Sequence, residues 1–147
     1  MTREINKIII HCAATPDYMD IGASTIRKWH TDPKPEGRGW NDIGYHYIVR
    51  RNGEIERGRQ DSVVGAHARG ANSDSIGICW VGINEIDAKQ ESSLFSLINY
   101  LMGKYNVKIE NVLGHREAVK TNKTCPNLNM DRVRAELIFV QPKPKVR

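Results

Sequence analysis

The sequence predicts a single α/β domain in which helices flank a central mixed β-sheet. Three observations favour this class: a nearly continuous β-branched run at residues 7–13, an Asn-Gly turn inside residues 44–57, and a helical repeat of apolar side chains over residues 94–105. Strands that alternate with helices, together with one hairpin, are typical of a mixed sheet covered on both faces. A length of 147 residues suits one domain.

The first strand is expected at KIIIHCA (7–13), because a run without polar alternation is typical of a strand buried on both faces. His11 then lies near the carboxyl end of this strand. Ser24 is the expected cap of the helix that follows, which ends before a proline-containing loop at residues 31–42. One face of that helix carries Ile26, Trp29 and His30.

The next two strands are predicted to form the hairpin GYHYIVRRNGEIER (44–57), because Asn-Gly between alternating segments is the strongest short-range hairpin signal. Alternation along the first of these strands places Tyr45, Tyr47 and Val49 on one face and His46 on the other. Tyr45 and His46 are therefore not expected to line the same pocket.

A loop rich in Gly, Asn and Ser at residues 65–75 leads into a further strand at residues 76–81. Gly77 within that strand indicates that backbone or a ligand comes close there. Asp87 and Gln90 can form a capping box for a long amphipathic helix. The apolar positions of this helix are Leu94, Leu97, Ile98, Leu101, Met102 and Tyr105.

The last strand is expected at Asn111 to Leu113, followed by Gly114-His115 and a loop to Cys125-Pro126. A closing helix from about Met130 to Phe139 uses Met130, Val133 and Leu137 as its apolar positions. We expect the folded domain to occupy residues 1–140 and the basic, proline-containing tail at 141–147 to be disordered.

Composition and charge exclude several classes of protein. A hydrophobic content of 39% argues against disorder, and three cysteines without a CxxC pair are not a disulfide framework. The early apolar run Ile8-Ile9-Ile10 is too short for a signal peptide or a membrane span, which predicts a protein made soluble in the cytoplasm without membrane insertion. The net charge of +5 is spread along the chain, so nucleic-acid binding is not expected.

The chain contains no GxGxxG, Walker A, HExxH, GxSxG or paired-cysteine zinc motif, so its chemistry has to come from residues far apart in sequence. His11, His115 and Cys125 are candidates, because two lie at strand ends and the third in the loop that follows. Two imidazoles and one thiolate suit zinc and leave one position open, as catalytic sites do. The spacing alone also allows each of them to be a structural, hydrogen-bonded residue.

Five segments occur in an order that resembles the zinc-dependent N-acetylmuramoyl-L-alanine amidases of the type 2 family. They are IIIHCAAT (8–15), DIGYHYIVRRNGEIERGR (42–59), VGAHARGANSDSIGICWVG (64–82), LGHREAVKTNKTCP (113–126) and the closing helix. Within the family the chain looks most like the small amidase lysozymes of T-odd bacteriophages, and peptidoglycan recognition proteins are more distant. The resemblance implies a peptidoglycan-recognition-protein/amidase-like fold, with residues 1–140 as the amidase catalytic domain.

The resemblance also implies functional roles for particular residues. One Zn²⁺ would be held by His11, His115 and Cys125, and Tyr45 and Lys123 would be the catalytic pair. Lys123 would stabilise the oxyanion, and Tyr45 would hydrogen-bond the nucleophile or relay a proton to the departing amine.

The same resemblance places two further residues. His67 is the expected substrate contact. Cys79 stands where cytosolic relatives often carry a catalytic Glu, which moves the acid/base role towards Tyr45. Independently of the resemblance, Cys79 and Cys12 are expected to be buried, inert thiols, because free cysteines are among the most buried residue types.

The implied function is that of a bacteriophage endolysin that hydrolyses the amide between N-acetylmuramic acid and L-alanine in peptidoglycan. It would act as a monomer and reach the anionic wall, which its positive charge favours, through holin-type permeabilisation of the membrane. A cytosolic amidase that recycles muropeptides and a non-catalytic peptidoglycan-binding module remain alternatives. The phage group also implies a second role, as a regulator of phage RNA polymerase.

Overall fold

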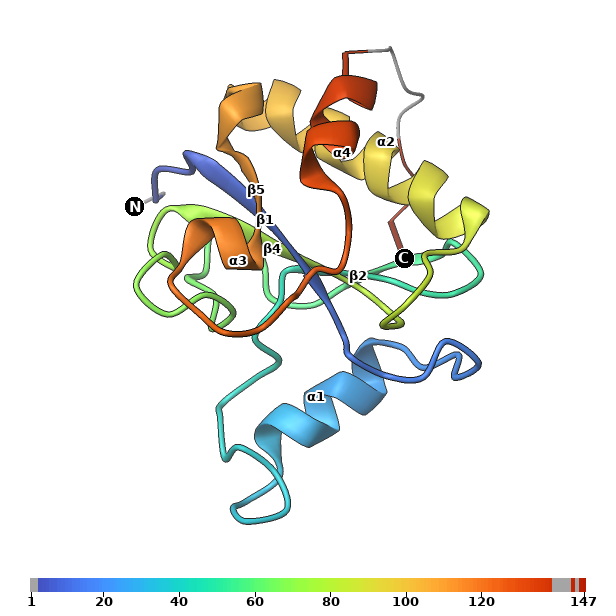
Figure 1. Cartoon of the computed structure of the whole chain (residues 1–147). Helices are drawn as coiled ribbons and strands as arrows, with labels where there is room; N and C mark the ends of the chain where they lie inside the picture. Colours follow the sequence, from blue (N-terminus) through green and yellow to red (C-terminus); the bar gives the residue numbers. More distant parts are fainter. Residues whose placement is uncertain (1–2, 139–143, 145) are drawn as a thin grey trace.

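The computed structural model describes residues 3–138, 144 and 146–147, and consists of one sheet with helices on both faces (Figure 1). The five strands lie in the order β3-β2-β4-β1-β5. Their bounds are Lys7–Cys12 (β1), Tyr47–Val49 (β2), Ile55–Arg57 (β3), Ser75–Trp80 (β4) and Val112–Gly114 (β5). β4 and β5 pair with β1 in parallel and β2 pairs with β4 in parallel, whereas β2 and β3 form an antiparallel hairpin. The predicted mixed sheet is confirmed.

The larger core lies between the sheet and the helices α2 (Ala88–Tyr105) and α4 (Met130–Glu136), which cover the same face in Figure 1. Leu94 and Leu97 of α2 pack there against Ile8 and Ile78 of the two central strands. The predicted inward positions Met130, Val133 and Leu137 are all buried in this core. The apolar periodicity therefore identified the inner faces of both helices.

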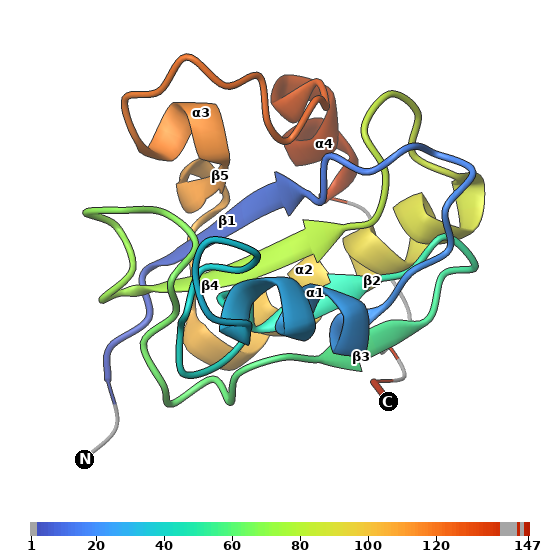
Figure 2. The ribbon, with the colours of Figure 1, turned by 90° about the horizontal axis from the view of Figure 1, so that it is seen from below.

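Two separate parts of the chain cover the opposite face of the sheet. Figure 2 shows this face from the side of α1 (Ala23–Thr31). Helix α1 packs through Ile26 against Ile48 and Cys79. The short helix α3 (His115–Ala118) and the loop before β4 instead cover Ile9. His11 is two residues after Ile9 on β1, so it lies on the same face.

The cap of α2 is as predicted, whereas the start of α1 is not. Asp87 accepts a hydrogen bond from the Lys89 N–H at 2.9 Å, and Gln90 accepts one from the Asp87 N–H at 3.0 Å. Helix α1 begins at Ala23, so Ser24 lies inside the helix and the prediction that it is the cap is wrong.

The start of α1 is held by a carboxylate from the neighbouring hairpin. The Ala23 N–H donates to Glu56 Oε1 of β3 at 2.8 Å. A Cβ on Gly22 would lie 2.3 Å from the same oxygen, so the glycine makes this long-range cap possible. On the helix itself Ile26 and His30 are buried, whereas Trp29 is 41% exposed.

The expected alternation through Tyr45 is also wrong. Strand β2 begins only at Tyr47, and Tyr47 and Val49 join the core under α2. Tyr45 instead packs with Ile48 on the opposite side. Residues 44–46 precede the strand, so the period-two rule that holds within it does not apply to them.

Strand β3 receives the last residues of the chain. Val146 forms a parallel bridge with Ile55, and the Arg147 N–H donates to the Ile55 carbonyl at 2.7 Å. The predicted folded domain at 1–140 and disordered tail at 141–147 stay predictions, because residues 139–143 and 145 lie outside the described part. Among the described residues, no helix combines the length and apolarity that crossing a membrane requires.

Candidate metal centre and cleft

Two histidines meet at neighbouring strand ends. Ile10 of β1 is paired with Gly114 of β5 in a parallel register, so His11 and His115 follow side by side. The centroids of their two rings are 4.6 Å apart. Residues distant in sequence thus come together at the carboxyl ends of parallel strands, as α/β sheets commonly arrange their sites.

Cys125 reaches the same place from the loop between α3 and α4. The Arg116 N–H donates to the Cys125 carbonyl at 3.1 Å, and the Cys12 N–H donates to Cys125 Sγ at 3.1 Å. A Cβ on Gly114 would lie 2.8 Å from Pro126 Cδ, so this glycine lets the loop approach β5. The loop is therefore tied both to α3 and to the end of β1.

The ligand atoms of His11, His115 and Cys125 all lie within 4.8 Å of one another. His11 is buried, whereas His115 and Cys125 are half-buried, so the trio is closed towards the sheet and open on the other side. Two imidazole nitrogens and one thiolate sulfur form the kind of three-ligand set that catalytic zinc sites use. The structure brings the three predicted ligands together into a candidate metal site.

The ionisation of these side chains fits a metal cation. Burial, followed by the neighbouring His67, His115 and Lys123, holds the pKa of His11 well below its ordinary value. Burial and Lys123 also lower the pKa of His115, so both imidazoles are neutral near neutral pH. The Cys12 thiol and burial raise the pKa of Cys125 in the metal-free protein. A cation bound there would displace this proton, which is the linkage expected of a thiolate ligand.

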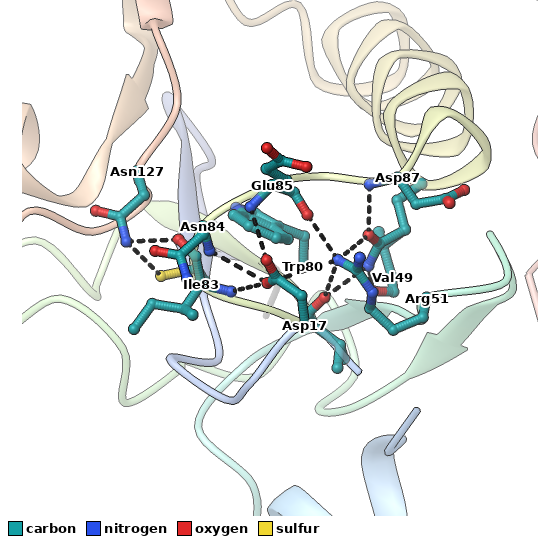
Figure 3. A network of polar contacts seen from close by, with 12 residues as sticks. Asp17, Val49, Arg51, Trp80, Ile83, Asn84, Glu85, Asp87 and Asn127 are labelled. Atoms are coloured by element: carbon teal, nitrogen blue, oxygen red, sulfur yellow. Dashed lines mark hydrogen bonds and ion pairs between the residues drawn. The ribbon is translucent and has the colours of Figure 1, made fainter. Parts of the chain in front are cut away.

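Polar contacts fix the loop that carries Cys125. Asn127 Nδ2 donates to the Ile83 carbonyl at 2.8 Å (Figure 3). Trp80 Nε1 donates to the Pro126 carbonyl at 2.9 Å. Both contacts join the loop that carries Cys125 to the segment at and after the end of β4. The position of Cys125 therefore depends on that segment.

Asp17 holds this segment in turn. Its carboxylate accepts hydrogen bonds from three successive backbone N–H groups, at 2.8, 3.2 and 3.0 Å, which belong to Ile83, Asn84 and Glu85 (Figure 3). The Arg51 guanidinium donates to the Glu85 carbonyl at 2.8 Å. Neither Asp17 nor Asn127 was anticipated from the sequence, because the partners of both are distant backbone groups.

The predicted site residues line one cleft of about 790 Å³. Its walls include the candidate ligands and the side chains predicted from the resemblance, namely His11, His115, Cys125, Tyr45, Lys123 and His67. The basic residues Arg38, Arg69 and Lys120 also contribute to its lining. A cleft of this size can hold a segment of a small polymer beside the metal site.

Tyr45 lies against the first ligand. Its ring centroid is 5.2 Å from that of His11 and 5.6 Å from that of His30. Burial, reinforced by the Cys79 and Cys125 thiols, raises the pKa of Tyr45 well above its ordinary value. The phenol therefore keeps its proton and is available as a hydrogen-bond donor.

Lys123 and Cys79 have opposite environments. Lys123 is exposed on the loop before Cys125, and its charge contributes to the lowered pKa of both His11 and His115. Cys79 is fully buried in β4, and burial raises the pKa of its thiol, so it stays protonated. Acid/base chemistry at this position of β4 is not available to the chain.

His30 of α1 also lines the cleft. Its Nδ1 accepts a hydrogen bond from the Gly44 N–H at 2.9 Å, directly before Tyr45. His46 has a structural setting instead: its Nδ1 accepts from the Gly77 N–H at 3.0 Å, and its Nε2 lies 2.7 Å from the Val63 carbonyl. It does not belong to the cleft lining.

His67 contacts the metal site from the loop before β4. Its Nδ1 lies 2.8 Å from His11 Nε2, and its ring packs on Gly77, where a Cβ would lie 2.5 Å from a ring atom. The close approach predicted at Gly77 is therefore that of the His67 ring. The His67 and Ala68 N–H groups donate to Asn72 Oδ1 at 3.0 and 2.8 Å, which fixes the loop.

Known proteins are similar to this chain in both sequence and fold. The protein-family model described as N-acetylmuramoyl-L-alanine amidase matches residues 1–128. The endolysin of Enterobacteria phage K11 is 36% identical over 140 residues, covering 88% of this chain and 85% of its own length. The endolysin of Escherichia phage T7 is 38% identical over 133 residues, covering 85% and 82%.

Two solved structures illustrate the similarity of fold. The N-acetylmuramoyl-L-alanine amidase LysC from Clostridium intestinale has a TM-score of 0.79 at 31% identity, covering 92% of this chain and 87% of that one. Drosophila peptidoglycan recognition protein LB has a TM-score of 0.72 at 27% identity, covering 93% and 81%.

Proposed function

The chain belongs to the N-acetylmuramoyl-L-alanine amidase family, and we propose that it is a zinc-dependent bacteriophage endolysin. As an amidase it hydrolyses the bond between N-acetylmuramic acid and L-alanine in peptidoglycan. The family match spans residues 1–128, and the phage endolysins are similar over more than four-fifths of this chain. The observation that carries the zinc dependence is the convergence of His11, His115 and Cys125 within 4.8 Å.

The proposed zinc ligands are His11, His115 and Cys125. When bound there, zinc supplies Lewis-acid chemistry, which activates water near neutral pH and polarises a carbonyl. The half-buried His115 and Cys125 border the cleft, so the substrate amide approaches from that side.

Lys123 and Tyr45 supply the remaining chemistry in this proposal. The Lys123 ammonium stabilises the negative charge that develops on the amide oxygen during attack. The Tyr45 phenol, whose pKa is raised, donates a hydrogen bond and can pass a proton to the departing alanine nitrogen. Cys79 is buried and protonated, which supports Tyr45 rather than a β4 residue in this role.

The lining of the cleft suits the substrate. Arg38, Arg69 and Lys120 add positive charge to its walls, and the stem peptides of peptidoglycan carry carboxylates. His67 also lines the cleft.

The two alternative functions are less well supported. A muropeptide-recycling amidase is disfavoured because Cys79 replaces the β4 carboxylate of such enzymes. A non-catalytic binding module is disfavoured because all three candidate ligands are present and converge.

We also propose a monomeric state, release to the wall through a holin, and a regulatory contact with phage RNA polymerase. Light scattering tests the first property, and co-expression with and without a holin tests the second. A pull-down with the purified polymerase tests the third.

The decisive experiment combines zinc content with wall hydrolysis. Purified protein is assayed on intact sacculi and on soluble muropeptides before chelation, after chelation, and after zinc is restored. We expect one zinc per chain, peptide release from sacculi, loss of release on chelation, and recovery with zinc. Hydrolysis that persisted without metal would overturn the proposal, and a preference for soluble muropeptides would favour the recycling alternative.

A further inference from the structure

We propose that His67 and Ser75 are positioning residues that set the tautomer of His11 through a chain of hydrogen bonds ending at the Ala71 carbonyl. The inference rests on the proposed zinc site, because its consequence is which nitrogen of His11 is free to bind metal. It gives His67 a role in preparing the ligand, in place of the predicted contact with substrate.

The donor and acceptor in each of these hydrogen bonds follow from the last one, which Ser75 makes with the Ala71 carbonyl. Ser75 is fully buried at the start of β4, and its Oγ lies 2.6 Å from the Ala71 carbonyl oxygen. A carbonyl oxygen only accepts hydrogen bonds, so the single hydroxyl proton of Ser75 is donated there. The oxygen of Ser75 is then left as an acceptor for any other partner.

The other partner of Ser75 is His67. His67 Nε2 lies 3.3 Å from Ser75 Oγ, and because that oxygen has already donated its proton, Nε2 is the donor. A neutral imidazole carries one N–H and one lone pair. The Nδ1 atom of His67 is therefore the unprotonated nitrogen.

The position of the proton on His11 follows from that on His67. His67 Nδ1 lies 2.8 Å from His11 Nε2, and two lone pairs do not face each other at that distance. His11 Nε2 therefore carries the proton and donates it, which leaves Nδ1 of His11 with the lone pair. Metal-binding histidines commonly donate their second N–H to a fixed acceptor, which orients the ring and raises its basicity.

The protein holds the ring of His67 in place from several sides. A Cβ on Gly77 would lie 2.5 Å from a ring atom of His67, and a Cβ on Gly65 would lie 2.7 Å from another. Asn72 fixes the backbone at His67 through its side-chain oxygen. Both ring nitrogens are occupied within the protein, so neither is left to hydrogen-bond peptidoglycan.

The first test reads the tautomers directly. Long-range ¹H–¹⁵N correlation spectra of the metal-free wild-type protein near neutral pH distinguish protonation at Nδ1 from protonation at Nε2. We expect His67 and His11 both to carry the proton on Nε2. A proton on Nδ1 of either ring would overturn the inference, and this test does not depend on whether any variant folds.

The second test removes the Ser75 hydroxyl, which links His67 to the Ala71 carbonyl. Ser75→Ala removes the hydroxyl without altering His67 or any ligand, and zinc affinity is measured by competition with a chelator. We expect affinity to fall about 10-fold or more, the usual effect of losing such a supporting contact. The spectrum of the metal-free variant should also lose the single Nε2-protonated form of His67.

The matched control is Ser93→Ala. Ser93 Oγ donates to the Gly53 carbonyl at 2.6 Å, the same length as the Ser75 contact but on α2, outside the cleft lining. Its zinc affinity should equal that of the wild type. If the wild type binds no zinc, the proposed function fails, and the inference is then decided by the tautomers of His67 and His11 in the metal-free protein. If the wild type binds zinc and Ser75→Ala binds it equally tightly, the inference alone is refuted.

Discussion

The backbone N–H of Cys12 donates a hydrogen bond to Cys125 Sγ at 3.1 Å, which joins the end of β1 to a loop 113 positions further along the chain. A hydrogen bond from a backbone N–H is strengthened when its acceptor is ionised. The contact therefore both positions Cys125 and favours its thiolate once a cation is present. Because the donor belongs to the residue after His11, one strand end controls two of the three proposed ligands.

Cys125→Ala should abolish both metal loading and wall hydrolysis. It leaves two imidazole ligands, fewer than zinc sites in enzymes use. Zinc per chain and peptide release from sacculi are the measurements, with circular dichroism to confirm folding. The control is Cys79→Ala, which also removes a thiol but outside the proposed ligand set, and it should keep its zinc. Full activity in Cys125→Ala would contradict the proposed metal site.

Lys123→Ala should separate catalysis from metal binding. The lysine is exposed and is not one of the candidate ligands, so zinc content should be unchanged. Turnover should fall by about 10²–10³-fold, as it does when one oxyanion donor is removed. Lys108→Ala removes the same charge outside the cleft lining and should leave turnover near wild type. Unchanged turnover in Lys123→Ala would remove this residue from the mechanism.

Tyr45→Phe tests the phenol hydroxyl alone. The substitution keeps the aromatic ring against His11, so zinc binding and stability should be little changed. Loss of a proton donor of this kind typically costs about 10²–10⁴-fold in rate, and we expect kcat rather than KM to fall. Steady-state kinetics on a defined muramoyl-peptide give both constants. An increase in KM with kcat unchanged would mean that Tyr45 only helps to bind substrate.

The features that the sequence predicted well are those encoded locally. The capping box of Asp87 and Gln90 spans one helical turn, and the Asn52-Gly53 turn lies between two adjacent strands. The start of α1 was misread for the opposite reason, since the carboxylate that caps it belongs to Glu56, 33 positions away. A local pattern cannot report a partner at that separation.

In the candidate site, too, local features were predictable from the sequence and contacts between distant residues were not. Strand-end positions brought His11 and His115 into consideration, and the parallel register of β1 with β5 places them together. Gly77 signalled a close approach but could not identify the His67 ring as its cause. The supporting contacts of Asp17 left no recognisable signal, because a carboxylate that binds backbone N–H groups needs no particular residue types as partners.

Binding to the cell wall should weaken as salt rises. The chain carries a formal net charge of +5, and cell walls are anionic. Exposed charges are screened within about 10 Å at 0.1 M salt and about 3 Å at 1 M. Sedimentation with purified sacculi should therefore show several-fold weaker binding at high salt, with zinc content unchanged as the control. Equal binding at both salt concentrations would show that the cleft, rather than net charge, holds the protein on the wall.

Asp61→Asn should destabilise the fold in a pH-dependent way without touching the cleft. Asp61 is nearly buried and accepts hydrogen bonds from Tyr105, from Tyr47 at 3.1 Å and from Arg57 at 2.6 Å. Burial alone would raise the pKa of its carboxyl, but these hydrogen bonds outweigh burial and lower the pKa below the ordinary 3.8. The ionised carboxylate therefore stabilises the folded state.

The sign of the pH dependence follows from that lowered pKa. The stabilisation is fully present above the ordinary pKa and is lost as the pH falls through the lower pKa of the folded state. Near neutral pH the variant should lose about 2 kcal/mol of unfolding free energy, the scale of hydrogen bonds to a charged group. Below about pH 4 the difference between wild type and variant should shrink, because the wild-type carboxyl begins to take up a proton.

Asp131→Asn provides the control for Asp61→Asn. Asp131 also pairs with an arginine, Arg134, at 2.9 Å, but its side chain is 95% exposed, so the pair should contribute little at any pH. Urea unfolding of both variants and the wild type, at neutral and acidic pH, gives the comparison. A stability difference for Asp61→Asn that stayed constant down to low pH would mean that the substitution acts through packing, because only the loss of an ionised carboxylate disappears when the wild type is itself protonated.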